Sequence, residues 1–175
     1  MKWNKDLIII KDNFFEEALF KKIQADLDTS KFENMYGVAK GGNSRKIYYS
    51  VSLSQDHPAH VAVRSFFKAE LGIIVKKMES LFLLSTKHKE PTPHDDLPFK
   101  INCTIYLRGG SLVHNGTALY EKNNEGVDVI NSHIGFKENR MVMFSAEKTH
   151  ASLQFAEGAT GRFIMGNWIN EYELE

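Results

Sequence analysis

The stretch FKINCTIYL, residues 99–107, decides the fold because apolar and polar side chains alternate along it without a break. Every odd-numbered residue in it is apolar, and the even-numbered residues are Lys100, Asn102, Thr104 and Tyr106. A period of two predicts a β-strand with two different faces. We expect the apolar face to pack on helices and the polar face to line a site inside the protein.

The chain before this strand has the spacing of helices. An Asn-x-x-Glu capping box at 13–16 is followed by apolar residues at helical intervals, which predicts a helix over about 13–28. A second helix is predicted over about 57–84, with Pro58 in its first turn and an apolar stripe that continues to Leu81. These two helices would be the elements that support the strand.

Turn residues separate the remaining elements. The segment GGNS at 41–44 predicts the turn of a hairpin. Its second strand would place four residues on one face: Ile47, Tyr49, Val51 and Leu53. Residues 85–98 contain three of the four prolines and should form a loop.

Short strands are predicted for the rest of the chain, at 117–121, 127–134, 140–146 and 160–169, with turns around 123–126 and 157–158. Two helices followed by many short strands favour an α+β fold with a double-stranded β-helix, a relative of the jelly roll. We expect one domain over 1–175, with helical and hairpin support at 1–90, a β-helix at 91–175 and the helices outside it.

Composition narrows the classes of function. The 175 residues are 42% hydrophobic and 25% charged, which is ordinary for a globular domain. Lys and Arg together number 22, as do Asp and Glu, so net charge indicates neither a nucleic-acid nor a membrane partner. Cys103 is the only cysteine and lies on the apolar face of its strand, which predicts a buried thiol and a cytoplasmic protein. Oligomeric state is not indicated.

Three residues have the types and order of a metal site. His94-Asp95-Asp96 precedes the alternating strand, and His150 follows an apolar run much further along the chain. Two imidazoles and one carboxylate leave about half the positions of an octahedral metal open, as in non-haem Fe(II) oxygenases. The expected ligands are therefore His94, Asp96 and His150.

A competing ligand pair stands six residues upstream, in His88-Lys89-Glu90. Pro91 and Pro93 separate this pair from the strand that begins at Phe99. A ligand pair needs rigid support, so we favour the downstream pair.

Arg162 is the only lysine or arginine after His150. Its planar guanidinium is suited to hold a carboxylate through two parallel hydrogen bonds, and an iron site of this kind needs such a group for a dicarboxylate co-substrate. Lys100, on the polar face of the alternating strand, is the rival cation.

Several motifs occur in an order that resembles a known family. His94-x-Asp96 is followed by a Tyr-Leu strand at 105–107, and then by glycine-rich turns at 109–110 and 115–117. The apolar strand at 140–144 leads to the distal histidine, and Arg162 precedes Trp168 by six positions. Over residues 94–168 the chain resembles the 2-oxoglutarate/Fe(II)-dependent dioxygenases, in particular the prolyl-hydroxylase-like branch.

This resemblance implies Fe(II), 2-oxoglutarate and O2 as cofactor and co-substrates, with succinate and CO2 as products of a C–H hydroxylation. It implies that Arg162 and the Tyr106 hydroxyl bind the far carboxylate of 2-oxoglutarate. Asn102, of the same parity as Tyr106, could add a hydrogen bond to the co-substrate.

Two positions of the sequence depart from the pattern of the family. Ile164 stands where many members have a small hydroxyl residue, and Arg108 stands where prolyl hydroxylases often have asparagine.

Two other classes of function are compatible with the sequence. The chain could instead be a catalytically silent β-helix that serves as a binding or structural module. It could also be a cupin-like metalloenzyme without 2-oxoglutarate, although such an enzyme would not need Arg162. No motif indicates the substrate, which could be a small molecule or a peptide.

Overall fold

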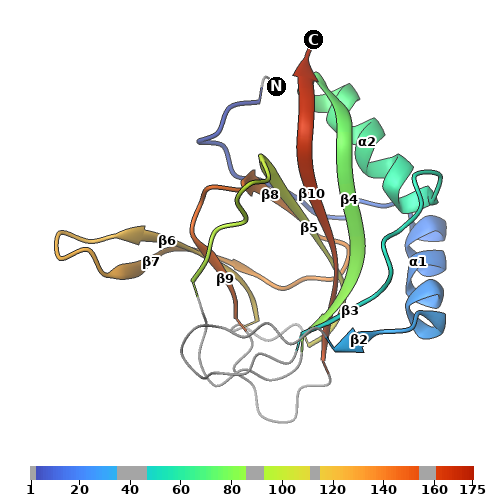
Figure 1. Ribbon diagram of the computed structural model, residues 1–175. Helices are drawn as coiled ribbons and strands as arrows, with labels where there is room; N and C mark the ends of the chain where they lie inside the picture. The colour runs from blue at the N-terminus through green and yellow to red at the C-terminus, as the bar shows by residue number, and fades with distance from the viewer. Residues whose placement is uncertain (1–2, 35–46, 86–92, 111–114, 154–160) are drawn as a thin grey trace.

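The computed structural model describes residues 3–34, 47–85, 93–110, 115–153 and 161–175. These residues form two helices and ten strands (Figure 1). In chain order the elements are β1 (Ile9–Lys11), α1 (Glu17–Thr29), β2 (Glu33–Asn34), β3 (Ile47–Tyr49), α2 (Pro58–Leu71), β4 (Ile73–Ser85), β5 (Ile101–Arg108), β6 (Gly116–Lys122), β7 (Asp128–Gly135), β8 (Met141–Ser145), β9 (His150–Leu153) and β10 (Arg162–Leu174). Neither helix combines the length and apolar character needed to cross a membrane.

The strands form two antiparallel sheets. The larger sheet has the order β1-β8-β5-β10-β4-β3-β2, and the smaller has the order β7-β6-β9. Every pair of neighbouring strands is antiparallel. A cluster of buried side chains from both sheets fills the space between them, including Leu119 and Ile134 from the smaller sheet and Phe144 and Ile164 from the larger one. Two such sheets are those of a β-sandwich or jelly roll, which agrees with the predicted class.

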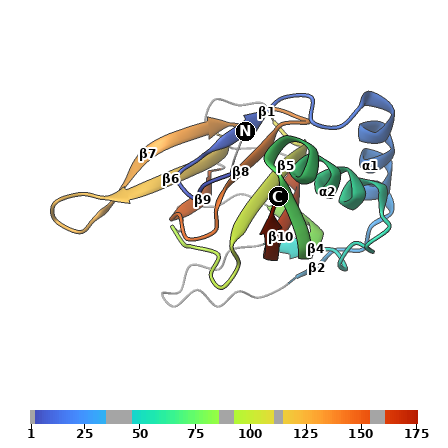
Figure 2. The ribbon, with the colours of Figure 1, turned by 90° about the horizontal axis from the view of Figure 1, so that it is seen from above.

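Both helices cover the outer face of the larger sheet, on the side away from β6 and β7 (Figure 2). Ile23 and Leu27 of α1 and Phe67 of α2 pack in one cluster with the odd-numbered residues of β5. Tyr106, an even-numbered residue of β5, belongs to the inner cluster instead. The two faces predicted from the alternation are therefore confirmed, and the even face points to the space between the sheets.

The prediction of a helix over 57–84 is wrong beyond Leu71. α2 begins at Pro58 as expected but ends where Gly72 takes a left-handed conformation with φ of 62°, and β4 follows at once. Ile74, Met78 and Leu81 keep a helical spacing, whereas the alternation of β4 is interrupted by a register shift at Lys77, so periodicity favoured a helix. Gly72 directly after an apolar stripe was the signal for the helix end.

The first helix begins at Glu17, four residues later than predicted, and the expected capping box is not formed. Its N-cap is Glu16, without a side-chain hydrogen bond, and Asn13 has a positive φ of 51°. The side chain of Asn139 holds this entry segment instead, because it accepts from the Phe15 amide at 2.9 Å and donates to the Phe15 carbonyl at 2.8 Å. A tertiary contact has replaced the local cap.

The four strands predicted after residue 107 are present as β6, β7, β8 and β10. The sequence did not predict β4 or β9, and β10 extends further than expected, to Leu174. The strand around 47 ends at Tyr49, and Val51 is 78% exposed, so the predicted face does not continue to Leu53. The hairpin turn at 41–44 and the turn at 157–158 lie outside the described residues, but β2 and β3 do pair as a hairpin requires.

Candidate metal and anion site

Backbone pairing brings two histidines from distant parts of the chain opposite each other. His94 and His150 form an isolated antiparallel bridge, with N···O distances of 3.0 and 2.8 Å in the two directions. Their ring centroids lie 4.5 Å apart. Residues opposite each other in such a bridge project to the same side. The bridge therefore fixes both imidazoles beside the same space.

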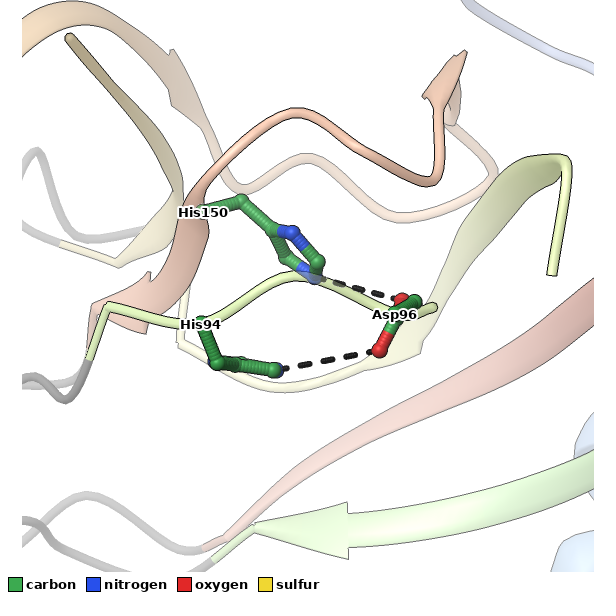
Figure 3. A group of neighbouring side chains, drawn as sticks. All are labelled: His94, Asp96 and His150. Atoms are coloured by element: carbon green, nitrogen blue, oxygen red, sulfur yellow. Dashed lines mark ion pairs between the residues drawn. The ribbon is translucent and has the colours of Figure 1, made fainter. Parts of the chain in front are cut away.

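Asp96 lies two residues after His94 and completes the group (Figure 3). Its amide donates to the Ala146 carbonyl at 2.9 Å, which holds this segment against the end of β8. Asp96 Oδ1 is 3.9 Å from His94 Nε2, and Asp96 Oδ2 is 3.4 Å from His150 Nε2. One ligand atom from each of the three residues lies within 4.8 Å of the others. These distances are short enough for one metal ion to bind all three.

The orientation of His150 suits a metal ligand. Its Nδ1 lies 2.9 Å from the Lys148 carbonyl oxygen, so the Nδ1–H donates there. This bond fixes the ring with its Nε2 facing Asp96, where the Nε2 lone pair could bind a metal, as is usual for metal-bound histidines. The edge of the Phe144 ring, 4.9 Å away between centroids, supports the imidazole from another side.

Asp96 is held in its ionised form. Burial raises its pKa, but hydrogen bonding and charge interaction with His150, together with hydrogen bonds from Asn102 and Trp168, lower the pKa to about 2. A carboxylate that accepts several hydrogen bonds in the folded state stays charged at neutral pH. The site thus presents an anionic oxygen and two imidazole nitrogens.

Further along the same interior, Arg162 is buried without a counter-charge. Only 2% of the residue is exposed, and burial lowers the pKa of its guanidinium. Its Nη1 donates to the Gly116 carbonyl and its Nη2 to Ser152 Oγ at 2.9 Å, while its Nε has no partner among the described residues. No described carboxylate pairs with it. A buried cation of this kind favours an anionic ligand, because an unpaired buried charge costs several kcal/mol.

Aromatic and hydroxyl groups surround this arginine. The guanidinium carbon lies 5.4 Å from the centroid of the Tyr106 ring, which stacks on Phe136 at 4.8 Å. The Tyr106 hydroxyl donates to Thr117 Oγ1 at 2.8 Å. Thr117 and Ser152 are direct neighbours in the β6–β9 register, so their hydroxyls can both serve a ligand at Arg162.

Gly116 explains how the arginine reaches this place. It has a φ of 146°, and a Cβ there would lie 2.0 Å from the Ile134 carbonyl oxygen. Only glycine allows this close approach of β6 to β7. Its carbonyl then faces Arg162, so the predicted glycine turn contributes directly to the site.

The two parts of the site lie at opposite ends of one surface. The register pairs Asn102 with Trp168 and Tyr106 with Ile164 on the inner faces of β5 and β10. We call the group at one end, His94, Asp96, His150, Asn102 and Trp168, the metal end. We call the group at the other end, Tyr106, Thr117, Ser152 and Arg162, the anion end. His150 and Ser152 are two residues apart on β9, so the ends are about 7 Å apart along that strand.

The structure brings together all six of the residues expected in the site, with one difference in detail. The Asn102 amide donates to Asp96, so its contact is with the carboxylate at the metal end. Lys100 is exposed, which removes it as the rival cation, and Cys103 is buried as predicted. The competing pair His88 and Glu90 lies outside the described residues.

Three residues at the site were missed as contributors. Trp168 donates from Nε1 to Asp96 Oδ2 at 2.9 Å, Ser152 accepts from Arg162, and Thr117 accepts from Tyr106. Trp168 was visible in the sequence only through its spacing from Arg162. Ser152, two residues after His150, could have been found from the alternation of a strand, had β9 been predicted.

Comparison with known proteins supports the fold. No protein-family model matches the chain, and no curated protein matches it in sequence. Among solved structures, a prolyl-4-hydroxylase from Pseudomonas putida aligns with a TM-score of 0.60 at 16% identity, over 94% of this chain and 92% of that one. A Trichoplax adhaerens prolyl hydroxylase, in complex with a hypoxia inducible factor peptide fragment, gives 0.62 at 14%, over 93% and 83%.

A third structure, HygX from Streptomyces hygroscopicus with nickel and 2-oxoglutarate bound, gives a TM-score of 0.57 at 9% identity, over 93% of this chain and 82% of that one. A 2OG-Fe(II) oxygenase family protein from Burkholderia pseudomallei is similar at the same TM-score, 0.57. The chain therefore has the fold of the 2-oxoglutarate/Fe(II) oxygenases over almost its whole length.

Proposed function

We propose that this protein is a 2-oxoglutarate- and Fe(II)-dependent dioxygenase that hydroxylates a C–H bond. In the balanced reaction, one substrate C–H group, one O2 and one 2-oxoglutarate give the hydroxylated product, succinate and CO2. The observation that carries the proposal is Arg162, a buried cation without a described counter-charge, at the far end of the surface that holds the His-Asp-His group. A metal site alone would not need it.

The residues at the metal end fit Fe(II). Two imidazole nitrogens and one carboxylate oxygen form the ligand set of non-haem iron oxygenases, and the ionised Asp96 offsets part of the charge of a divalent cation. The Nδ1 bond of His150 presents its Nε2 to the metal. When bound, Fe(II) would activate dioxygen, with 2-oxoglutarate supplying electrons through its decarboxylation.

The residues at the anion end fit a carboxylate. Arg162 would bind the far carboxylate of 2-oxoglutarate and donate hydrogen bonds to it, since its Nε–H has no described partner and its charge is uncompensated. Thr117 and Ser152 accept hydrogen bonds from Tyr106 and Arg162, so each hydroxyl proton is free to turn toward a ligand. These hydroxyls would take the place of the one that the family often has at the position of Ile164.

The separation of the two ends is also suitable. About 7 Å along β9 separates His150 from Ser152, a distance that a five-carbon dicarboxylate can span with its keto acid end toward the metal.

As part of this proposal, the two sheets form the double-stranded β-helix that the sequence predicts. His94, with 40% of its side chain exposed, marks the side from which a substrate would approach. The substrate itself remains unspecified.

The test is binding of 2-oxoglutarate to the Mn(II)-loaded protein without oxygen turnover, measured as a rise in unfolding temperature. At a hundredfold excess over Kd, the ligand should stabilise the native state by about 2.7 kcal/mol. Pyruvate, which lacks the far carboxylate, should stabilise it much less. Arg162→Lys keeps the charge but loses the planar fork, and we expect it to weaken 2-oxoglutarate binding at least tenfold.

Equal stabilisation by pyruvate and 2-oxoglutarate would contradict the assignment, and the chain would then be read as a metal protein of another kind. If neither Mn(II) nor 2-oxoglutarate raised the unfolding temperature, the chain would be a silent β-sheet module. If 2-oxoglutarate does bind, succinate formed in the presence of Fe(II), 2-oxoglutarate and candidate substrates would identify the substrate class.

A further inference from the structure

The two oxygens of Asp96 have different surroundings. We propose that Asn102 and Trp168 form a clamp that holds the Asp96 carboxylate in the orientation in which it would bind the metal together with His94 and His150. The proposal rests on the function proposed above, because it concerns the same metal end. It assigns Asn102 and Trp168 as positioning residues, a role that was predicted for neither.

The hydrogen bonds of the carboxylate carry this proposal. Trp168 Nε1 donates to Oδ2 at 2.9 Å, and Asn102 Nδ2 donates to the same oxygen. Two donors occupy both lone pairs of one carboxylate oxygen. Oδ2 also lies 3.4 Å from His150 Nε2, whereas Oδ1 receives no hydrogen bond from the described residues and lies 3.9 Å from His94 Nε2.

The pairing of β5 with β10 places both donors of the clamp beside Asp96 without a ligand. Asn102 on β5 and Trp168 on β10 are direct partners in the antiparallel register. Thr104 Oγ1 donates to the Asn102 amide oxygen at 3.0 Å, which turns the amide nitrogen toward Asp96. A Cβ at position 166 would lie 2.4 Å from the Trp168 ring, so Gly166 leaves the space in which the indole lies. Both donors are thus held by the fold.

The clamp would act on the residues that would hold the metal. With two donors on Oδ2, the Asp96 carboxylate is kept beside His94 and His150, the other two expected ligands. Loss of a donor should therefore weaken metal binding, because partners of this kind orient a metal ligand.

Two matched tryptophan variants test the clamp, because the chain has only two tryptophans. Trp168→Phe keeps a ring but removes the N–H donor, and Trp3→Phe changes the other tryptophan, which is buried in the outer cluster. Each variant of the full chain is titrated with Co(II), and binding is followed by the visible absorption of the metal. We expect Trp168→Phe to weaken Co(II) binding about tenfold to a hundredfold, as is usual for a lost partner of a metal ligand.

The Co(II) absorption spectrum of Trp168→Phe should also change, because the Asp96 carboxylate would be held less firmly at the metal, whereas Trp3→Phe should match the wild type in affinity and spectrum. A purely structural role would alter the unfolding temperature but not the spectrum of the bound metal. In Trp3→Phe, Trp168 is the remaining tryptophan, and Co(II) should quench its fluorescence with the same Kd.

Wild-type Co(II) affinity and spectrum in Trp168→Phe would overturn the clamp while leaving the metal site intact. If Trp168→Phe did not fold, Asn102→Ala would remove the other donor and should give the same change in affinity and spectrum. If the wild type bound neither Co(II) nor Mn(II), the proposed function would fail together with the clamp. The two failures are therefore distinguishable.

Discussion

The metal end and the anion end differ in how their charged side chains are compensated. At the metal end the carboxylate of Asp96 already has His150, Asn102 and Trp168 as partners, and burial of its charge is compensated. At the anion end the guanidinium of Arg162 is fully enclosed but lacks a described carboxylate partner. One end is complete without a ligand, whereas the other has a charge that only a ligand would balance. Two predictions test this difference, and a third concerns a carboxylate away from both ends.

The largest effect is expected at the metal end. His94→Ala should abolish binding of Fe(II) or Mn(II), with a loss of at least about a hundredfold, because only two of the three ligands remain. Metal content after dialysis and the Mn(II) dissociation constant measure this. His88→Ala is the matched control and should bind metal like the wild type. The reverse result would place the ligand pair six residues upstream.

A smaller and opposite effect is expected at the anion end. Arg162→Met removes an uncompensated buried charge and fills the same volume, so the ligand-free protein should unfold at or above the wild-type temperature. The stabilisation by 2-oxoglutarate, about 2.7 kcal/mol at a hundredfold excess over Kd, should disappear. Thermal unfolding with Mn(II), with and without 2-oxoglutarate, measures both. A ligand-free variant that is much less stable would show that Arg162 is mainly structural.

The smallest effect is expected away from both ends, at Asp12. Hydrogen bonds from Arg140 and Lys137 hold the pKa of this carboxyl well below its usual value of 3.8. The folded-state pKa is lowered, so the ion pairs stabilise the fold above the unfolded pKa, and this contribution is lost as pH falls below about 4.

Asp12→Asn should therefore reduce stability by about 0.5–1 kcal/mol at pH 7, since the pair is partly exposed, and by less at pH 3. Urea unfolding of the variant and the wild type at both pH values measures the difference. Metal and 2-oxoglutarate affinities should not change. An equal loss at both pH values would mean that the charge of Asp12 is not what stabilises this contact.

Sequence reasoning was most reliable where one short motif carries the information. His94 and Asp96 are two residues apart in an extended segment, so their common side follows from local geometry. The two faces of β5 follow from strict alternation in the same way. It failed for β4, where a register shift interrupts the alternation and the strand is decided by pairing with β10 and β3. It also missed β9, which is only four residues long.

The sequence by itself determined the types of residue in the site and their order: two histidines, an aspartate and a late arginine. It could not determine their partners. That Asn102 and Trp168 hold Asp96, and that Ser152 and Gly116 contact Arg162, depend on registers between strands far apart in the chain. Tertiary structure alone decided these contacts, because a one-residue shift of register would turn each side chain to the other face of its sheet.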